Sequence, residues 1–156
     1  GGVPRRADQG RCGKLTAALE WWLSFGRSEE LLRLAEKEKL RGRKSALDSK
    51  VDLWPENAHV WHAFGEISGG RPVGFGVVGI PRSEFTDWAT RIEGLRGQER
   101  TDFVMLCCAM DRAFVKWHET QDEKRTQARE SELRENEASD RAPTRKGSAV
   151  EKRSRR

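Results

Sequence analysis

The feature that most constrains the fold is an apolar stripe with helical spacing in the second half of the chain. Apolar side chains recur there at every third or fourth residue, namely Phe103, Leu106, Cys107, Met110, Ala113, Phe114 and Trp117. This spacing places them on one face of an amphipathic α-helix, which we expect to begin near Thr101. A helix of this kind is stabilised by packing, so other apolar faces must cover the stripe.

The N-terminal part of the chain supplies two further helical patterns. Residues 14–25 carry an apolar stripe, and Gly26 follows as a stop signal. Ser28 is expected to cap a second helix that reaches about residue 40, because serine accepts hydrogen bonds from the first turn. We interpret residues 40–52 as a linker or a frayed helix.

Two more helices are predicted in the middle of the chain. Within Trp54-Pro55-Glu56-Asn57, Pro55 suits a first helical turn and Asn57 is an alternative cap. The apolar face that follows consists of Val60, Trp61, Phe64 and Ile67. After a glycine-rich stretch, Ser83 is predicted to cap a helix whose stripe is Phe85, Trp88, Ile92 and Leu95.

These patterns predict an all-α protein with a glycine-rich loop between two helices. We expect residues 1–13 to be disordered, residues 14–52 to form a helical hairpin and linker, and residues 53–118 to form an aromatic-rich helical core domain. Residues 119–156 should form a charged helix extension and a disordered basic tail, because no apolar stripe continues beyond Trp117.

Composition excludes several classes of protein. Apolar and charged residues each make up 35% of the chain, so the core must come from part of it. No apolar run approaches the length of a membrane span, and no signal peptide is visible, so we expect a cytoplasmic protein. Cys12, Cys107 and Cys108 lack disulfide or zinc spacing and are predicted to be free thiols.

The glycine-rich stretch contains a possible nucleotide-binding motif. Gly74, Gly76 and Gly79 have the G-x-G-x-x-G spacing of a dinucleotide-binding loop. Such a loop follows a β-strand and opens a helix, whereas here a predicted helix precedes it and the next begins only after Pro81. We therefore interpret the stretch as a connection between two helices. We expect its apolar side chains, Val73, Phe75, Val77, Val78 and Ile80, to tuck into the core.

The sequence nominates no catalytic residue, cofactor or metal site. His59, His62 and Glu66 share a helix face at a spacing that metal ligands could use, but this face lies opposite Val60 and Phe64. We expect the three side chains to be exposed to solvent. No nucleophile–base set is visible, which predicts a non-enzymatic protein.

The net charge of +5 leaves nucleic-acid binding open as an alternative. The basic runs at 41–44 and 151–156 could contact phosphates weakly and without reading sequence. The chain begins Gly1-Gly2-Val3, which fits a trimmed initiator methionine, a cloning remnant or the downstream part of a longer translation product.

The middle of the chain resembles tail assembly chaperones of tailed phages and prophages. The resemblance rests on Trp54-Pro55-Glu56-Asn57, on residues 60–89 and on residues 103–119. Its features are an aromatic helix, a glycine-rich loop, an Ile-Pro segment that starts a helix, and a closing helix with Met110, Asp111, Ala113 and Phe114. Many relatives have Gln-Trp-Arg after the first helix, of which this chain keeps only Arg71.

The resemblance implies a non-catalytic assembly factor, similar to the frameshift-linked second half of these chaperones. Such a protein would bind tail-tube or tape-measure protein and be absent from the finished particle. Trp21, Trp22 and Trp61 are the candidate contact residues. A phage nucleic-acid-binding regulator and a structural virion component of the tail or connector remain alternatives, and assembly into a homo-oligomer stays open.

Overall fold

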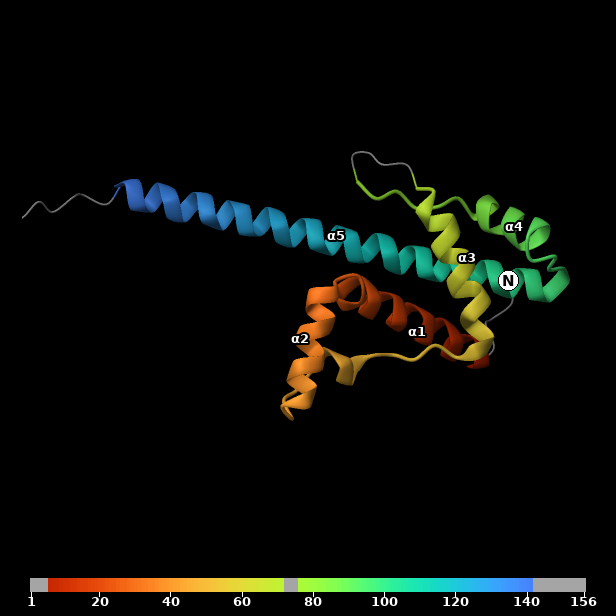
Figure 1. Ribbon diagram of the computed structural model, residues 1–156. Helices are drawn as coiled ribbons and strands as arrows, with labels where there is room; N and C mark the ends of the chain where they lie inside the picture. The colour runs from red at the N-terminus through yellow and green to blue at the C-terminus, as the bar shows by residue number, and fades with distance from the viewer. Residues whose placement is uncertain (1–5, 72–75, 142–156) are drawn as a thin grey trace, which may run out of the picture. The chain divides into compact units, whose positions relative to one another are not determined.

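The computed structural model describes residues 6–71 and 76–141, with side chains at 10–71 and 76–139 (Figure 1). All regular structure in these ranges is helical, which confirms the predicted all-α class. The five α-helices are α1 (Arg6–Trp21), α2 (Glu29–Leu40), α3 (Ala58–Gly69), α4 (Arg82–Arg91) and α5 (Gly97–Arg141). Contacts divide the chain into two compact units, residues 1–120 and residues 121–156.

Helix α1 begins earlier than the sequence predicts. Residues 6–13, which we expected to be disordered, are helical despite Gly10 and Gly13. Tertiary contacts explain the difference: Arg11 Nε donates to Asn57 Oδ1 at 2.9 Å, and Cys12 packs against the core. Burial and a long-range hydrogen bond outweigh the modest helix propensity of this segment. Residues 1–5 lie outside the described residues.

A π-helical turn, Trp22–Gly26, ends the first helix at the predicted stop. A Cβ atom on Gly26 would lie 2.6 Å from Trp22 Cδ1, so a glycine permits the close approach of the indole. Ser28 then caps α2 as predicted, because its Oγ accepts from the backbone N–H of Leu31 at 3.3 Å. The π-helical turn thus connects α1 to α2.

The segment after α2 is ordered by its own capping contacts. A short 3-10 helix, Ala46–Ser49, has a capping box in which Ser45 and Asp48 exchange hydrogen bonds. The buried hydroxyl of Ser45 also donates to the Ala35 carbonyl at 2.6 Å, which fastens the linker to α2.

Helix α3 follows a 3-10 turn, Pro55–Asn57, in which Pro55 occupies the first turn as predicted. The prediction that the side chain of Asn57 caps this helix is wrong. Asn57 directly precedes α3, but its side chain makes no capping hydrogen bond. It is fully buried and accepts from Arg11 instead. Val60 and Phe64 are buried, and Trp61 and Ile67 pack against the core, so the predicted face is confirmed.

Helix α4 differs from the prediction at both ends. Ser83 is not its cap, since Pro81 occupies that position and its carbonyl accepts from the N–H of Glu84 at 3.0 Å. Phe85 is buried and Trp88 packs on the core. Ile92, however, is 64% exposed, because α4 ends at Arg91 and the chain turns through Gly94, at φ +66°, before it returns to the core.

Helix α5 begins at Gly97 rather than near Thr101. Its first turn is polar and includes Glu99, whose carboxylate suits the positive end of a helix, so the helix starts before its apolar stripe. Beyond residue 121 the described side chains are all exposed, as expected for a charged extension. The helix extends to Arg141, and residues 142–156 lie outside the described residues.

The core of the first unit is formed by residues of α1, the π-helical turn, α3, α4 and α5. Its buried cluster comprises Leu15, Leu19, Leu23, Val60, Ala63, Phe64, Phe85, Ala89, Phe103, Val104, Leu106, Cys107 and Met110. Residues from the N-terminal hairpin and from the aromatic-rich middle of the chain thus share one core.

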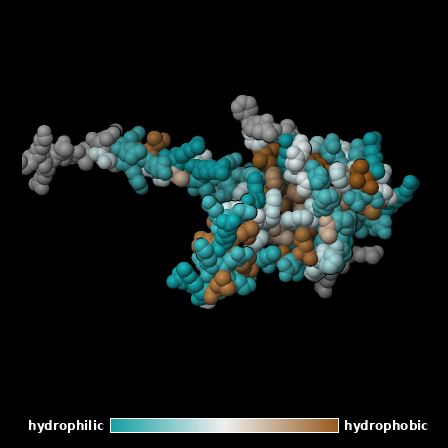
Figure 2. All heavy atoms as spheres, in the orientation of Figure 1, coloured by the Kyte–Doolittle hydropathy of each residue, from teal (hydrophilic) through white to brown (hydrophobic). Residues whose placement is uncertain are grey.

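The face seen in Figure 2 is mostly hydrophilic, with separate groups of hydrophobic side chains. The exposed large apolar residues include Trp22, Leu31, Leu34, Leu40, Trp54, Val78, Ile92 and Leu133. No helix in the described part of the chain is long and apolar enough to cross a membrane.

Candidate functional site

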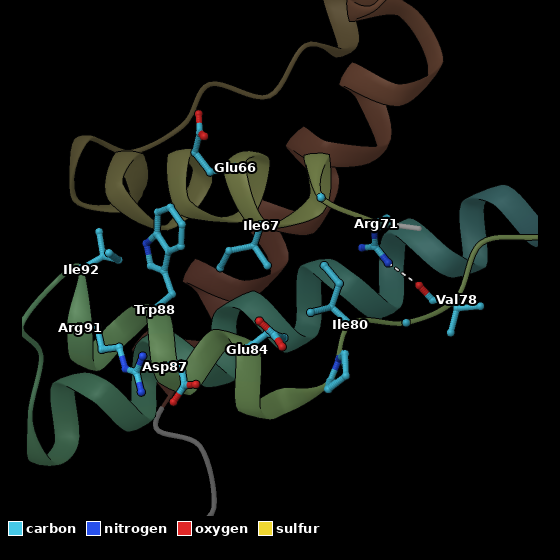
Figure 3. Close-up of a pocket in the computed structure, with 13 residues that line it drawn as sticks. Glu66, Ile67, Arg71, Val78, Ile80, Glu84, Asp87, Trp88, Arg91 and Ile92 are labelled. Carbon is cyan, nitrogen blue, oxygen red and sulfur yellow. Dashed lines mark hydrogen bonds between the residues drawn. The ribbon is translucent and has the colours of Figure 1, made fainter. Parts of the chain in front are cut away.

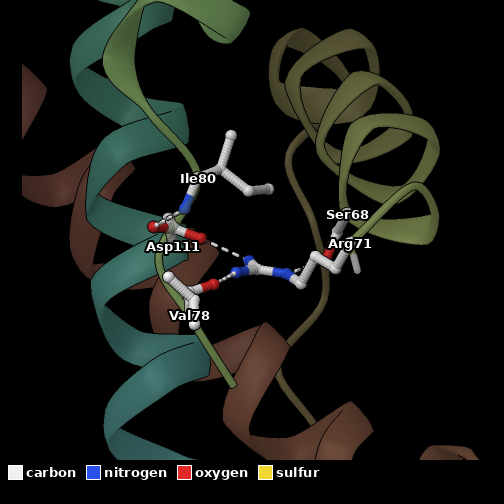
Figure 4. Close-up of polar contacts among 5 residues, drawn as sticks. All are labelled: Ser68, Arg71, Val78, Ile80 and Asp111. Carbon is white, nitrogen blue, oxygen red and sulfur yellow. Dashed lines mark hydrogen bonds and ion pairs between the residues drawn. The ribbon is translucent and has the colours of Figure 1, made fainter. Parts of the chain in front are cut away.

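A buried ion pair joins Arg71, just after α3, to Asp111 in the first third of α5 (Figure 4). Arg71 Nη2 contacts Asp111 Oδ1, and the two side chains are only 10% and 9% exposed. The other ion pairs in the described residues, Arg33–Glu29 and Arg125–Asp122, lie in solvent. Breaking a buried pair destabilises the fold more than breaking an exposed one, because the remaining charge is left uncompensated in the interior.

This ion pair holds the chain segment that leads into α4. The second oxygen of Asp111 accepts from the backbone N–H of Ile80 at 3.0 Å. Arg71 Nη1 donates to the Val78 carbonyl at 2.7 Å, and its Nε donates to Ser68 Oγ at 2.9 Å. Each charged group is therefore satisfied by several partners, and together they fasten residues 78–80 between α3 and α5.

Aromatic rings support the guanidinium group of Arg71. Its Cζ lies 4.4 Å from the ring centroid of Phe114 and 6.0 Å from that of Phe64. Phe64 in turn stacks on Phe85 at a centroid distance of 6.4 Å. A planar guanidinium over an aromatic face gains cation–π attraction in addition to its hydrogen bonds. An arginine is thus better suited to this position than a lysine.

The glycine-rich stretch connects α3 and α4, as predicted. Gly74 lies outside the described residues, and Gly76 has φ +129°, which favours glycine. A Cβ on Gly79 would lie 3.2 Å from Asp111 Oδ2, so this glycine lets the chain approach the carboxylate closely. Because the N–H of Ile80 already binds that carboxylate, the end of the loop is occupied by a negative group rather than open to phosphate.

The apolar side chains of this stretch behave differently from one another. Ile80 packs against the core as expected, but Val78 is 72% exposed, so the prediction that it tucks inward is wrong. The carbonyl of Val78 faces Arg71, and this contact leaves its side chain in solvent. The predictions for Val73 and Phe75 concern residues outside the described ranges.

An open groove of about 770 Å³ lies beside the ion pair, between α3 and α4 (Figure 3). We call it the α3–α4 groove. It is lined by Glu66, Ile67, Gly70, Arg71, Val78, Gly79, Ile80, Pro81, Glu84, Asp87, Trp88, Arg91 and Ile92. Figure 3 shows Ile67, Ile80 and Trp88 between the two helices, with Glu66 on α3 and Glu84 on α4. The groove combines apolar side chains with carboxylates.

Of the three candidate contact residues, Trp21 has a structural partner. Its indole N–H donates to the carbonyl of Ala46 at 2.9 Å, and the Lys50 ammonium lies 5.8 Å from its ring centroid. The side chain is only partly exposed. Trp21 therefore ties α1 to the segment that follows α2.

Trp22 and Trp61 contact each other, and we call them the aromatic pair. Their ring centroids are 6.4 Å apart at an interplanar angle of 87°, an edge-to-face arrangement. Trp22 is 41% exposed, and the guanidinium of Arg27 lies 5.7 Å from its ring centroid. Trp61 packs against the core, so the pair is anchored on one side and open to solvent on the other.

The possible metal ligands and the cysteines considered in the sequence form no reactive site in the described residues. His59, His62 and Glu66 are exposed, as expected, and His59 stacks on Phe103 at 5.8 Å. Burial raises the pKa of Cys107 from 9.0 to about 12, with smaller contributions from Cys108 and Glu93. Cys107 is thus held as a neutral thiol at physiological pH, which suits a packing role.

The fold and the site define a helical protein in which a buried arginine–aspartate pair shapes an open, partly apolar groove. The family model of the phage tail assembly chaperones matches residues 38–116, about half of the chain, and the chain belongs to this family. No curated protein and no solved structure matches the chain. The matched residues contain Arg71, Asp111 and the whole α3–α4 groove, whereas Trp21 and Trp22 precede them.

Family membership confirms the resemblance seen in the sequence and the expectation of a non-catalytic protein. The partnership of Arg71 and Asp111 was not predicted, although both residues occur in the motifs that carry the resemblance. A signal was available: Asp111 follows Cys107 by four residues on the apolar stripe and precedes Phe114 by three. A carboxylate on a buried face requires a partner of opposite charge.

Proposed function

We propose that this tail assembly chaperone binds a tail-tube or tape-measure protein and holds it until the tail polymerises. The aromatic pair is the observation that carries this assignment. Trp22 exposes a large apolar ring beside the core-anchored Trp61. Tryptophan is enriched among residues that dominate binding energy at protein interfaces, and a pre-oriented ring loses little entropy on binding.

Trp22 and Trp61 are the proposed contact residues, and Trp21 has a supporting role. Because the indole N–H of Trp21 is bound to Ala46, its contribution is to hold the turn that presents Trp22. The charged segments outside the core would adjust the rate of encounter through long-range electrostatics. The complex would form in the cytoplasm of the host bacterium, where the tail is assembled.

Co-purification tests the proposal. The full chain is co-expressed separately with the tail-tube and the tape-measure protein encoded with it, and we expect it to retain one of them. Trp22→Ser should weaken capture about tenfold or more, as for a tryptophan at an interface centre. Trp54→Ser is the matched control, since Trp54 is similarly exposed, at 37%, in the same unit.

Capture of neither tail protein would contradict the proposal. Equal losses for the two variants would contradict the role of the aromatic pair. Thermal unfolding of both variants shows whether a loss reflects the interface or the fold. Mass spectrometry of purified particles adds a second readout: a chaperone is absent from them, whereas a structural tail component is present.

A further inference from the structure

The α3–α4 groove has the dimensions of a binding site for side chains. Its volume of about 770 Å³ falls within the range typical of ligand sites, roughly 300–1,000 Å³. Ile67, Ile80 and Trp88 form an apolar floor that is itself packed against the core. Val78 and Ile92 are 72% and 64% exposed, so aliphatic side chains extend the apolar surface beyond the floor.

The charges that line the groove favour a cationic occupant. Three carboxylates line it, from Glu66, Glu84 and Asp87. None of them forms an ion pair within the described part of the chain. Of the two arginines in the lining, Arg71 is neutralised by Asp111, which leaves Arg91 against three carboxylates.

The backbone around the groove favours a helical occupant. Both walls are helices, α3 and α4, whose internal backbone groups are already bonded. Between them, the Val78 carbonyl is bound by Arg71 and the N–H of Ile80 is bound by Asp111. The described residues around the groove offer an extended peptide no strand edge to pair with. An amphipathic helix, in contrast, satisfies its own backbone and can place an apolar face into a groove.

We infer that the α3–α4 groove binds an amphipathic helix that carries aliphatic side chains on one face and lysine or arginine beside them. The aliphatic side chains would lie on Ile67, Ile80 and Trp88, and the cations would reach Glu66 and Glu84. This inference rests on the proposed function, since the helix would belong to the tail protein that the chaperone holds. The Arg71–Asp111 pair has a positioning role, because it holds Val78 and Ile80 at the groove.

Two designed helical peptides probe the groove of the full chain. Both have the same leucine face; one has lysines beside it and the other has glutamates. We expect the lysine peptide to bind more tightly, with an advantage that shrinks as salt is added. Labelled backbone amides in 66–71, 76–80 and 82–92 should shift on binding, as measured by NMR.

Charge reversal makes the test specific. Glu84→Lys should weaken binding of the lysine peptide about fivefold at low salt and should strengthen binding of the glutamate peptide. Glu36→Lys is the matched control, because Glu36 is exposed on α2 and the change in net charge is identical. Ile92→Ser should weaken both peptides, and Leu34→Ser, at an exposed leucine of α2, should weaken neither.

Several outcomes would overturn the inference. These are equal affinity for the two peptides, equal effects of Glu84→Lys and Glu36→Lys, or a dimer of the free chain that Glu84→Lys dissociates. The last result would assign the groove to a second copy. If neither peptide binds while the chain still captures a tail protein, the assignment of the groove is contradicted and the proposed function is supported. If the lysine peptide binds but no tail protein is captured, the proposed function falls instead.

Discussion

The two parts of α5 have the same secondary structure for different physical reasons. Up to Trp117 the helix presents an apolar stripe to a core, and Phe103, Cys107 and Met110 are at most 2% exposed. From residue 122 to residue 139 every side chain is exposed, and Leu133, at 62% exposure, is the only large aliphatic residue in this range. The first part depends on burial, while the second depends on helix propensity and local charge pairs such as Asp122–Arg125. Helix continuity therefore does not imply equal stability along α5.

The largest expected effect comes from removing a core ring in the first part. Phe103→Ala should lower the free energy of unfolding by about 3–5 kcal/mol, because it leaves a cavity in the buried cluster. Leu133→Ala, in the second part, should change it by less than about 0.5 kcal/mol. Chemical denaturation measures both values. Similar losses at the two positions would mean that the second part is also held by packing.

The buried ion pair should have the next largest effect. Asp111→Ala leaves the guanidinium of Arg71 without its carboxylate and frees the N–H of Ile80, at a cost of about 3 kcal/mol. The double variant Arg71→Met/Asp111→Leu should recover part of this loss, because no unpaired charge remains. If the single variant is as stable as the parent chain, the pair does not hold the segment before α4. The exposed pair provides the comparison, since Asp122→Ala should cost less than about 1 kcal/mol.

A smaller effect depends on pH. Cys107 keeps its proton in the folded state up to a pKa of about 12, whereas an unfolded chain loses it near 9.0. Between these values the folded state binds more protons, so stability is retained below about pH 9 and falls by about 1.4 kcal/mol per pH unit above it. Cys107→Ala should remove this part of the slope in denaturation curves measured from pH 8 to 11. An unchanged slope would show that other groups produce it.

The smallest effect should arise in the exposed part of α5. Ala128→Gly should lower local helix stability by about 1 kcal/mol, because glycine loses more backbone entropy in a helix. We expect a reduced helical signal in circular dichroism and an unchanged melting temperature for the first unit. A lowered melting temperature would couple the second part to the core.

The sequence predicted the features of this fold that periodicity controls. The apolar faces of α3 and α5, the stop at Gly26 and the cap at Ser28 all follow from local spacing and side-chain chemistry. The start of α1 at Arg6 could not be read in this way, because it depends on contacts of Arg11 and Cys12 with distant residues. Local patterns predict that a helix forms, whereas the positions of its ends also depend on tertiary contacts.

The candidate site was predicted only in part, for a related reason. The exposed position of Trp22 agrees with its choice as a contact residue, but that role remains a proposal. The α3–α4 groove was not predicted, because it exists only when Glu66, Glu84 and Ile92 are brought together by the turn between α3 and α4. Ile92 was expected on a buried stripe, and its exposure results from the end of α4 at Arg91. A groove of this kind is a property of tertiary arrangement rather than of any one motif.

Hydrogen exchange of the full chain, alone and with the tail protein that it captures, compares the packed and the exposed parts of α5 and locates the binding surface. In the free chain, amides of residues 103–117 should exchange only on global unfolding, and those of residues 122–139 should exchange with little protection. On binding, new protection should appear in α3, in α4 and around Trp22. Equal protection along α5, or new protection confined to residues 122–139, would contradict the account.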